Sequence, residues 1–292
     1  MQQDITHIDF DRNKHPGIDF EIMPINAVLE QDYGDHSPLR PHRLNFYLLL
    51  IITGGEGLHT IDFLDYPCHR GTVLTIRKDQ VHQFQKTMLE GYMLLFTEEF
   101  VLSYLEQTGA HKIRELFNEL LFSQQTVLEG EAFAQMLALV SEIATEFGTA
   151  RDEHSPGIIR NLLQVLVSRL HRHKAGLQES AAQKYREQFL AFQQLVEAHC
   201  AENRSVQFYA EKLAITPRTL HTITRAVIGK SSKEFIDQLC VLRIKRLLIN
   251  SSLSIKEIAF AMGFEETTNF FKYMKRMTGM TPEAFREAHI AG

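Results

Sequence analysis

Apolar residues occur in short runs, separated by turn-forming residues, over the first hundred positions of the chain. The runs are rich in β-branched and aromatic residues, clusters of Gly, Pro and Asp separate them, and TGGEG at 53–57 has the composition of a hairpin turn. We expect strands at 18–23, 45–53, 57–63, 71–77, 81–85 and 91–96. Many short strands without intervening helices are typical of an antiparallel sandwich or barrel.

After about residue 97, the spacing of the apolar residues changes to that of helices. Apolar residues recur at helical spacing over 98–106, 112–121, 131–147 and 158–173. These helices could pack against the strands or form a dimer interface, and we expect both. The small, polar stretch that follows predicts a linker, and the pattern from Tyr185 onward is helical. The predicted organisation is a strand-rich domain at 1–100, a helical segment at 101–175, a linker at 176–184 and a helical domain at 185–292.

The helical domain contains the same plan twice, at about 205–229 and about 254–279. Each copy begins with Ser as a helix N-cap, and Ser254 with Glu257 forms a capping box. A short apolar-faced helix, a tight turn and a longer helix follow, and Pro217 is the first residue of the longer helix in the first copy. This pattern predicts two helix-turn-helix motifs. A connecting helix at about 231–250 would fix the distance between them, so both could enter adjacent major grooves, about 34 Å apart.

The outward faces of the two longer helices correspond at an offset of fifty residues, and neither contains an acid. A helix that only faces solvent would more often carry Glu and Lys in pairs. Positions i, i+3, i+4 and i+7 form one row, as a helix inserted into a groove requires. We expect base contacts from Arg218, His221, Thr222, Arg225, Thr268, Phe271 and Lys272, and phosphate contacts from Thr267, Asn269, Lys275 and Arg276.

Phe271 is unusual because it is an apolar ring on a face that carries lysines. It could contact a thymine methyl group. Alternatively, the ring could pack against the turn at Phe264. The sequence leaves both interpretations open.

The net charge of −5 divides unevenly along the chain. Residues 183–292 hold 16 Lys and Arg against 11 Asp and Glu, a balance of +5, and residues 1–182 hold 15 against 25, a balance of −10. This asymmetry indicates that only the C-terminal part contacts a polyanion.

Three cysteines without paired spacing argue against a disulfide framework or a structural zinc site, and for a reducing compartment. The N-terminus lacks the cationic and apolar regions of a signal peptide, and no apolar run is long enough to cross a bilayer. We expect a cytoplasmic protein without a membrane partner.

The segment SIKEIAFAMGFEETTNFFKYMKRMTGMTPEAFR at 254–286 resembles the DNA-binding domain of the AraC/XylS regulators, and the resemblance extends over roughly 185–290. The matching positions are Ile258-Ala259, Gly263-Phe264, Phe270, Lys275, Gly279, Thr281-Pro282 and Arg286. Met274 and Phe285 replace the Phe and Tyr usual in that family, and both changes suit a core. Thr222 and Thr224 stand where many members carry Arg and Phe. The base preference of the first motif therefore cannot be inferred from relatives.

The resemblance implies an N-terminal cupin-like barrel that binds an effector and contributes to dimerisation, and residues 40–84 resemble the sensor segment of these regulators. The expected fold is α+β multidomain: an antiparallel cupin-like β-barrel with helices, then an all-α domain with two helix-turn-helix motifs. Strand alternation and the resemblance give effector-binding candidates Arg40, His42, Tyr47, Thr53, His59, His82 and Phe84. Arg40, His42 and Arg43 together hint at an anionic effector.

The function implied is that of a sequence-specific transcription regulator, more often an activator, and not an enzyme. Its expected partners are double-stranded promoter DNA, a small-molecule effector, RNA polymerase and a second copy of the chain, with no cofactor. The alternatives are a cupin-type metal enzyme with an appended DNA-binding domain, and a pure protein-interaction module. A cupin enzyme usually needs a His-x-His pair. The residues two positions before and after His59 are Gly57 and Ile61, not a second histidine, so we expect no metal.

Overall fold

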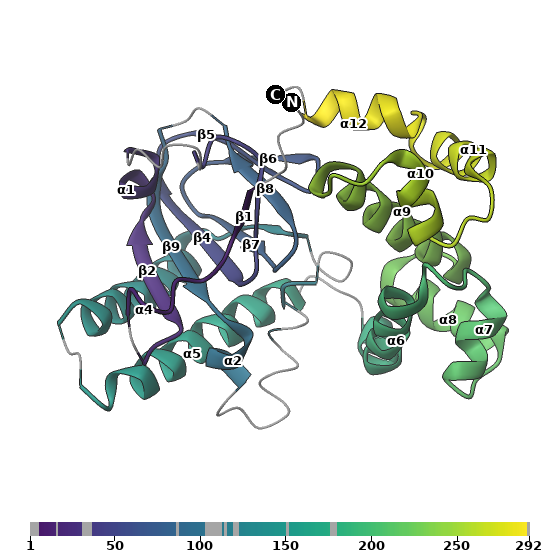
Figure 1. The fold of residues 1–292 in the computed structure, drawn as a ribbon. Helices are drawn as coiled ribbons and strands as arrows, with labels where there is room; N and C mark the ends of the chain where they lie inside the picture. The colour runs from purple at the N-terminus through teal and green to yellow at the C-terminus, as the bar shows by residue number, and fades with distance from the viewer. Residues whose placement is uncertain are drawn as a thin grey trace. The chain divides into compact units, whose positions relative to one another are not determined.

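The computed structural model describes residues 6–15, 17–30, 37–85, 88–102, 113, 116–118, 123–149, 152–175 and 180–290. The chain folds as two compact units, one formed by Thr6–Leu177 and the other containing Gln178–Gly292. The first is rich in strands and the second is helical, as the change from purple and teal to green and yellow shows in Figure 1. Each unit is described by itself.

The N-terminal unit is built on two five-stranded sheets. The first has the order β1 (Thr6–Ile8), β3 (His42–Leu44), β8 (Val81–Phe84), β5 (Gly57–Ile61) and β6 (Leu64–Cys68). The second has the order β10 (Gln125–Val127), β7 (Thr72–Ile76), β4 (Tyr47–Gly54), β9 (Glu90–Phe96) and β2 (Phe20–Pro24). Neighbouring strands are antiparallel except for β1 and β3, which are parallel. The expected antiparallel, sheet-rich N-terminal domain is therefore confirmed.

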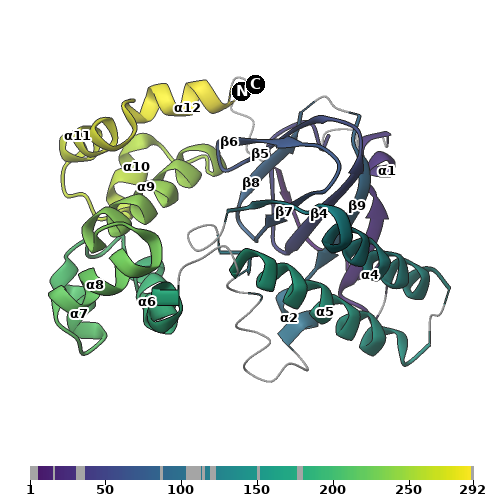
Figure 2. The same cartoon turned by 180° about the vertical axis from the view of Figure 1, so that it is seen from behind.

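The continuous apolar sequence of β4 follows from burial of both of its faces. Alternate residues of a strand point to opposite sides of the sheet. Leu48, Leu50 and Ile52 belong to the core that the two sheets share, together with residues such as Phe84. Leu49 belongs to a second core, formed by the other face of the sheet and the helices α4 (Gly130–Thr149) and α5 (Ser155–Ala175). Figure 2 shows these two helices along one side of the sheets.

The strands that were not predicted from the sequence are short or irregular. The six predicted strands correspond to β2, β4, β5, β7, β8 and β9, whereas β1, β3, β6 and β10 were not predicted. Three of these four have three residues, too few for an alternation to be recognised, and β6 contains Pro67. The sequence also missed the short helix α1 (Ile25–Glu30).

The helical segment agrees with the sequence wherever it is described. The stretches 131–147 and 158–173 lie within α4 and α5, and α2 (Glu98–Leu102) covers the start of 98–106. Much of 112–121 lies outside the described residues, as do 103–112 and the first part of the predicted linker, 176–179. The prediction for 180–184 is wrong because α6 (Ser180–His199) begins there. The sequence SAAQK lacks Gly and Pro and contains strong helix formers, so nothing in it ends a helix.

The C-terminal unit contains the two predicted helix-turn-helix motifs. The first consists of α7 (Val206–Lys212) and α8 (Pro217–Ile228), and the second of α10 (Ile255–Ala261) and α11 (Thr267–Thr278). The connecting helix α9 (Ser232–Asn250) contacts α6, both motifs and the last helix, α12 (Pro282–Ile290). Because α9 lies in the middle of the unit, it is apolar on several sides, with Phe235, Ile236 and Ile244 fully buried.

Capping residues fix where these helices begin and end. Ser231 with Glu234 and Ser254 with Glu257 form complete capping boxes at the starts of α9 and α10. Gly229 and Gly279 adopt the left-handed conformation at the ends of α8 and α11. In the described part of the chain, no helix is both long and apolar enough to cross a membrane.

Candidate nucleic-acid interface and effector pocket

The outward face of α8 carries the predicted polar row. Thr216 starts the helix by accepting the backbone N–H of Thr219 at 3.1 Å. Leu220, Ile223 and Thr224 are buried. The four residues predicted to contact bases, Arg218, His221, Thr222 and Arg225, are exposed.

Two of these four side chains already make local hydrogen bonds. Thr222 donates from Oγ1 to the carbonyl of Arg218 at 3.1 Å, and Arg225 donates from Nη1 to the carbonyl of Gly229 at 2.6 Å. The guanidinium of Arg218 makes no hydrogen bond or ion pair with another described residue. It lies in the first turn of α8, the part of a recognition helix that usually contacts base edges.

The outward face of α11 is similar. Phe270, Tyr273 and Met274 are buried, and the predicted contact residues Thr268, Asn269, Lys272, Lys275 and Arg276 are exposed. Thr267 is half-buried at the first helical position. The ammonium groups of Lys272 and Lys275 make no hydrogen bond or ion pair within the described part of the chain, and α11 contains no acidic residue.

Phe271 is half-buried, with its ring edge-on to Phe270 at a centroid distance of 6.3 Å. The aromatic partners recorded for Phe264 are instead Phe270 and Tyr273. Part of the Phe271 ring is thus accounted for by packing, and the rest is accessible on the lysine-bearing face.

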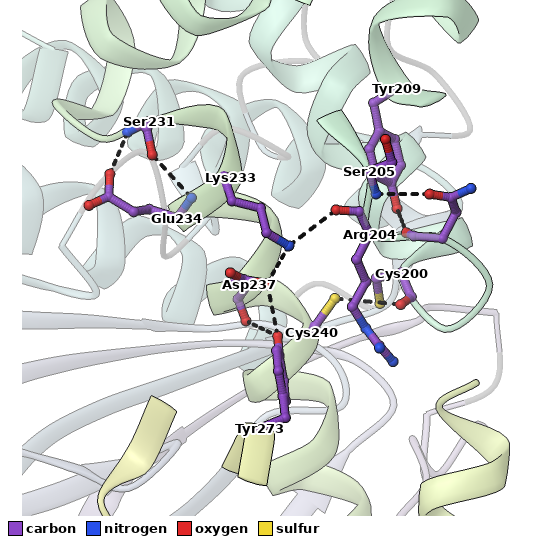
Figure 3. A network of polar contacts seen from close by, with 11 residues as sticks. Cys200, Arg204, Ser205, Tyr209, Ser231, Lys233, Glu234, Asp237, Cys240 and Tyr273 are labelled. Carbon is purple, nitrogen blue, oxygen red and sulfur yellow. Dashed lines mark hydrogen bonds and ion pairs between the residues drawn. The ribbon is translucent and has the colours of Figure 1, made fainter. Parts of the chain in front are cut away.

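A network of polar contacts, which was not predicted from the sequence, joins the two motifs (Figure 3). The Arg204 guanidinium, just before α7, lies 4.0 Å from the centroid of the Phe264 ring and donates to the carbonyl of Met262. Met262 and Phe264 belong to the turn between α10 and α11, so Arg204 ties the beginning of the first motif to the turn of the second.

The same network reaches α9 and α11. Lys233 donates to Asp237 Oδ1 at 2.9 Å and to the Arg204 carbonyl at 3.2 Å, and the Tyr273 hydroxyl lies 3.1 Å from Asp237 Oδ1. We call Arg204, Lys233, Asp237 and Tyr273 the clamp. Because Tyr273 lies on α11, the clamp fixes that helix to α9 and to Arg204, which lies just before the first helix of the first motif.

A close backbone contact supports the clamp. Gly263 has a φ of +71°, and a Cβ built on it would lie 1.9 Å from the carbonyl oxygen of Ala201. The turn of the second motif therefore packs directly on the loop between α6 and α7. The spacing of α8 and α11 depends on this contact and the clamp as well as on the connecting helix predicted from the sequence.

Three of the predicted effector-binding residues form a buried histidine cluster in the N-terminal unit. His42 and His82 are directly opposite in the β3–β8 pair, with ring centroids 4.1 Å apart. His82 Nδ1 lies 3.2 Å from His59 Nε2, and the His59 ring meets Phe84 edge-on. Strands β3, β8 and β5 are neighbours in one sheet, and this brings the three rings together.

Burial keeps these imidazoles neutral at pH 7. It lowers the pKa of His42, although the hydrogen bond to the Arg40 carbonyl acts in the opposite direction. Burial lowers the pKa of His59 to about 3, and it holds the pKa of His82 well below its ordinary value, with the neighbouring histidines acting in the same direction. No group of three or more His, Cys, Asp or Glu with the geometry of a metal site occurs among the described residues.

A pocket of about 450 Å³ lies beside the histidines. Its apolar lining includes Phe10, Met23, Leu44, Phe46 and Met93, and its polar lining includes His42, His82, Asp9, Asp11, Lys14 and Glu21. A pocket of this size and composition suits a small organic molecule. The sequence did not reveal the contribution of residues 6–14, because a three-residue strand gives no recognisable pattern.

The other predicted effector residues lie elsewhere. Tyr47 is buried in the core beneath α4 and α5, where it packs against Phe96 and Phe117, because it lies on the helix-facing side of β4. His59 and Phe84 are buried behind His82 and do not line the pocket, nor does half-buried Thr53. Arg40 is exposed, and neither Arg40 nor Arg43 lines the pocket, so these two cations would not contact a molecule bound there.

Comparisons with known proteins agree with this division into a pocket-bearing unit and a paired helix-turn-helix unit. Residues 26–182 match the AraC-like ligand binding domain, and residues 209–288 match a helix-turn-helix domain. The chain belongs to the AraC family. It is a transcription regulator with a ligand-binding domain and a helix-turn-helix DNA-binding domain, as the sequence predicted.

Similar members of the family include transcriptional activators named RhaS. The chain is 24% identical over 257 residues to RhaS of Citrobacter koseri, with 86% of this chain and 88% of the relative covered. It is 24% identical over 285 residues to RhaS of Klebsiella pneumoniae, with 94% and 96% covered. These regulators support a DNA-binding, non-enzymatic protein.

Solved structures that match the chain include unsaturated-fatty-acid-bound ToxT of Vibrio cholerae, at 14% identity and a TM-score of 0.45, with 87% of this chain and 91% of that chain covered. The C-terminal domain of the response regulator yesN of Fusobacterium nucleatum is 23% identical, with a TM-score of 0.32, and covers 35% of this AraC-family chain and 99% of its own.

Proposed function

We propose that this protein is a cytoplasmic transcription activator that binds promoter DNA through α8 and α11 under the control of a small organic effector. The observation that carries the proposal is the pair of exposed, acid-free faces on two helices that belong to one packed unit. The helix α9, at 19 residues, is about 28 Å long, which suits two helices that enter successive grooves.

Within this proposal, the contacts divide by chemistry. Arg218, His221, Thr268 and Lys272 approach bases, and Thr222 and Phe271 add a hydroxyl and an apolar contact. Lys275, Arg276, Thr267 and Asn269 hold phosphates. Arg225 lies at the C-terminal end of α8 and is bonded to the Gly229 carbonyl, so a phosphate contact suits it better than the base contact expected from the sequence.

The proposal extends to assembly and output. The RhaS relatives are named activators, which supports activation and contact with RNA polymerase here. Helix α5 carries the exposed apolar residues Ile158 and Val165 next to its buried face, which supports dimerisation through this side of the N-terminal unit.

The test is selection of genomic fragments on the purified full chain, followed by titration of a selected duplex at 50 and 200 mM salt. A regulator of this kind should select a common sequence and lose affinity steeply with salt, because it displaces counterions from phosphates. Selection of no common sequence, or binding that does not change with salt, would contradict the proposal. A protein-interaction module predicts that second outcome.

A further inference from the structure

We propose that the pocket of the N-terminal unit takes an uncharged, largely apolar molecule that presents one hydroxyl or carboxamide group to His42 and His82. This inference deepens the proposed function, on which it rests, by naming the chemical class of the effector. It begins from a buried polar atom without a partner.

His82 is 1% exposed and lines the pocket, and its Nε2 has no hydrogen-bond partner among the residues that the structure describes. A buried polar nitrogen without a partner costs free energy. A polar group of a ligand in the pocket would remove this cost. Such an atom is the feature that distinguishes a binding pocket from a gap between apolar side chains.

The hydrogen-bonding roles follow from the neighbours. His42 Nδ1 lies 2.9 Å from the Arg40 carbonyl, which can only accept, so Nδ1 carries the proton and Nε2 carries a lone pair. In the His82–His59 pair, one nitrogen donates and the other accepts. If His59 donates, His82 carries its proton on Nε2 and offers a donor to the pocket.

The other tautomer is less favourable with a ligand bound. If His82 donates, the N–H of His59 lies at Nδ1. That atom is buried, has no partner in the described part of the chain and belongs to a residue outside the pocket lining. A hydrogen-bond acceptor on the ligand, placed at His82 Nε2, therefore favours the tautomer in which His59 donates to His82. In that tautomer the N–H of His59 is bonded to His82 and the N–H of His82 is bonded to the ligand. His42 then offers an acceptor and His82 a donor, and a hydroxyl or a carboxamide matches both.

The ionic counterparts of these groups match the two imidazoles less well. Burial keeps both rings neutral, so neither ring supplies a counter-charge to a carboxylate. An ammonium has no lone pair, so it cannot accept a hydrogen bond from His82 Nε2. The described lining has three carboxylates, Asp9, Asp11 and Glu21, against one ammonium, Lys14, which is paired with Glu21. That balance, 1 − 3 = −2, adds repulsion against an anion.

The experiment compares ligands with one skeleton and different head groups on the full chain. Isothermal titration would use 4-phenylbutan-1-ol, 4-phenylbutanamide, 4-phenylbutanoate and 4-phenylbutylamine at pH 7.5. The alcohol or the amide is expected to bind at least tenfold more tightly than the carboxylate and the amine. Binding of either ion as tightly as the alcohol, or no binding of the alcohol and amide at millimolar concentration, would overturn the inference.

A variant pair locates the contact. His82→Phe should weaken binding of the alcohol at least tenfold and leave binding of butylbenzene, which has no polar group, unchanged. The matched control is His69→Phe at an exposed histidine outside the pocket lining, which should change neither. If His82→Phe weakened binding of the alcohol and of butylbenzene equally, His82 would have only a packing role, and the assigned contact would be contradicted.

The DNA titration on the same preparations separates this inference from the function on which it rests. Loss of the head-group preference with intact salt-dependent DNA binding would refute the ligand class and leave the regulator standing. Absence of sequence-specific DNA binding would refute the proposed regulatory function, whichever of the ligand probes binds.

Discussion

The buried ammonium of Lys174 should make the stability of this protein depend on pH. Lys174, in the last turn of α5, is 5% exposed, and its Nζ donates to the carbonyl of Ser123 at 2.8 Å. Burial lowers its pKa to about 7. An unfolded lysine keeps its proton to about pH 10. Between about pH 7 and pH 10 the unfolded chain therefore binds more protons than the folded protein, so stability rises with pH across this window.

Lys174→Met should consequently stabilise the protein at pH 7, by about 1 kcal/mol or more, because each unit of pKa shift corresponds to about 1.4 kcal/mol. The gain should shrink as the pH approaches 10. Urea unfolding at pH 7 and pH 9.5 measures both effects. Lys256→Met, at an exposed lysine of α10, is the control and should show no such pH dependence. A gain for Lys174→Met that is the same at both pH values would show that its ammonium is not the cause.

Residues on the outward face of α11 should differ in what they recognise. Lys272→Ala should relax preference at one position of the selected site by about 1–3 kcal/mol, because a base contact is lost. Arg276→Ala should weaken binding to all sequences alike and reduce the salt slope by about one. Competition titrations against single-base variants of the site distinguish them. If Lys272→Ala left site selection unchanged, the assignment of the reading face would be wrong.

At the scale of elements, the turn of the second motif is more constrained than that of the first. Gly263 combines a φ of +71° with close approach to the Ala201 carbonyl. The first motif has Ala214 at a φ of +54°, so the left-handed backbone alone is tolerated there. The difference between the copies lies in the contact, which ties the second turn to the loop after α6.

Gly263→Ala should therefore destabilise the C-terminal unit by about 3 kcal/mol, from backbone strain plus a clash that the carbonyl cannot avoid. Binding of the half-site read by α11 should be lost first. Gly279→Ala is the matched control, since Gly279 has a φ of +77° but its Cβ would meet open space, and it should cost only about 1 kcal/mol. Thermal unfolding and DNA titration measure both. Equal costs for the two variants would show that the Ala201 contact is unimportant.

The sequence predicts those parts of the structure that are determined by residues close together along the chain. Both helix-turn-helix motifs follow from caps, apolar spacing and the Pro217 signal, all within a few residues, and they were predicted with nearly correct bounds. The strand β4 was predicted, but not which face bears Tyr47, because a strand buried on both faces gives no alternation. The histidine cluster and the clamp join residues distant in sequence, so only the register of the strands and the packing of α9 reveal them.

At the scale of the whole molecule, each unit has a core of its own. The N-terminal unit has cores on both sides of its second sheet. In the C-terminal unit, Phe235 of α9 packs against Phe189 and Phe192 of α6. Each unit should thus fold alone, and the regulator should combine two separable properties, DNA recognition and assembly with effector response.

Truncation tests this separation. A chain starting at Gln178 should fold and select the same DNA sequence as the full protein, because the clamp and both recognition helices lie within it. It should bind a duplex with one site as tightly as the full chain does. On a duplex with two sites it should bind at least 10²-fold more weakly than the full chain, because the proposed dimerisation through the N-terminal unit would make the second binding event of the full chain intramolecular. Anisotropy titrations of both duplexes supply the comparison, and equal affinity on the two-site duplex would place the dimer contact outside residues 6–177.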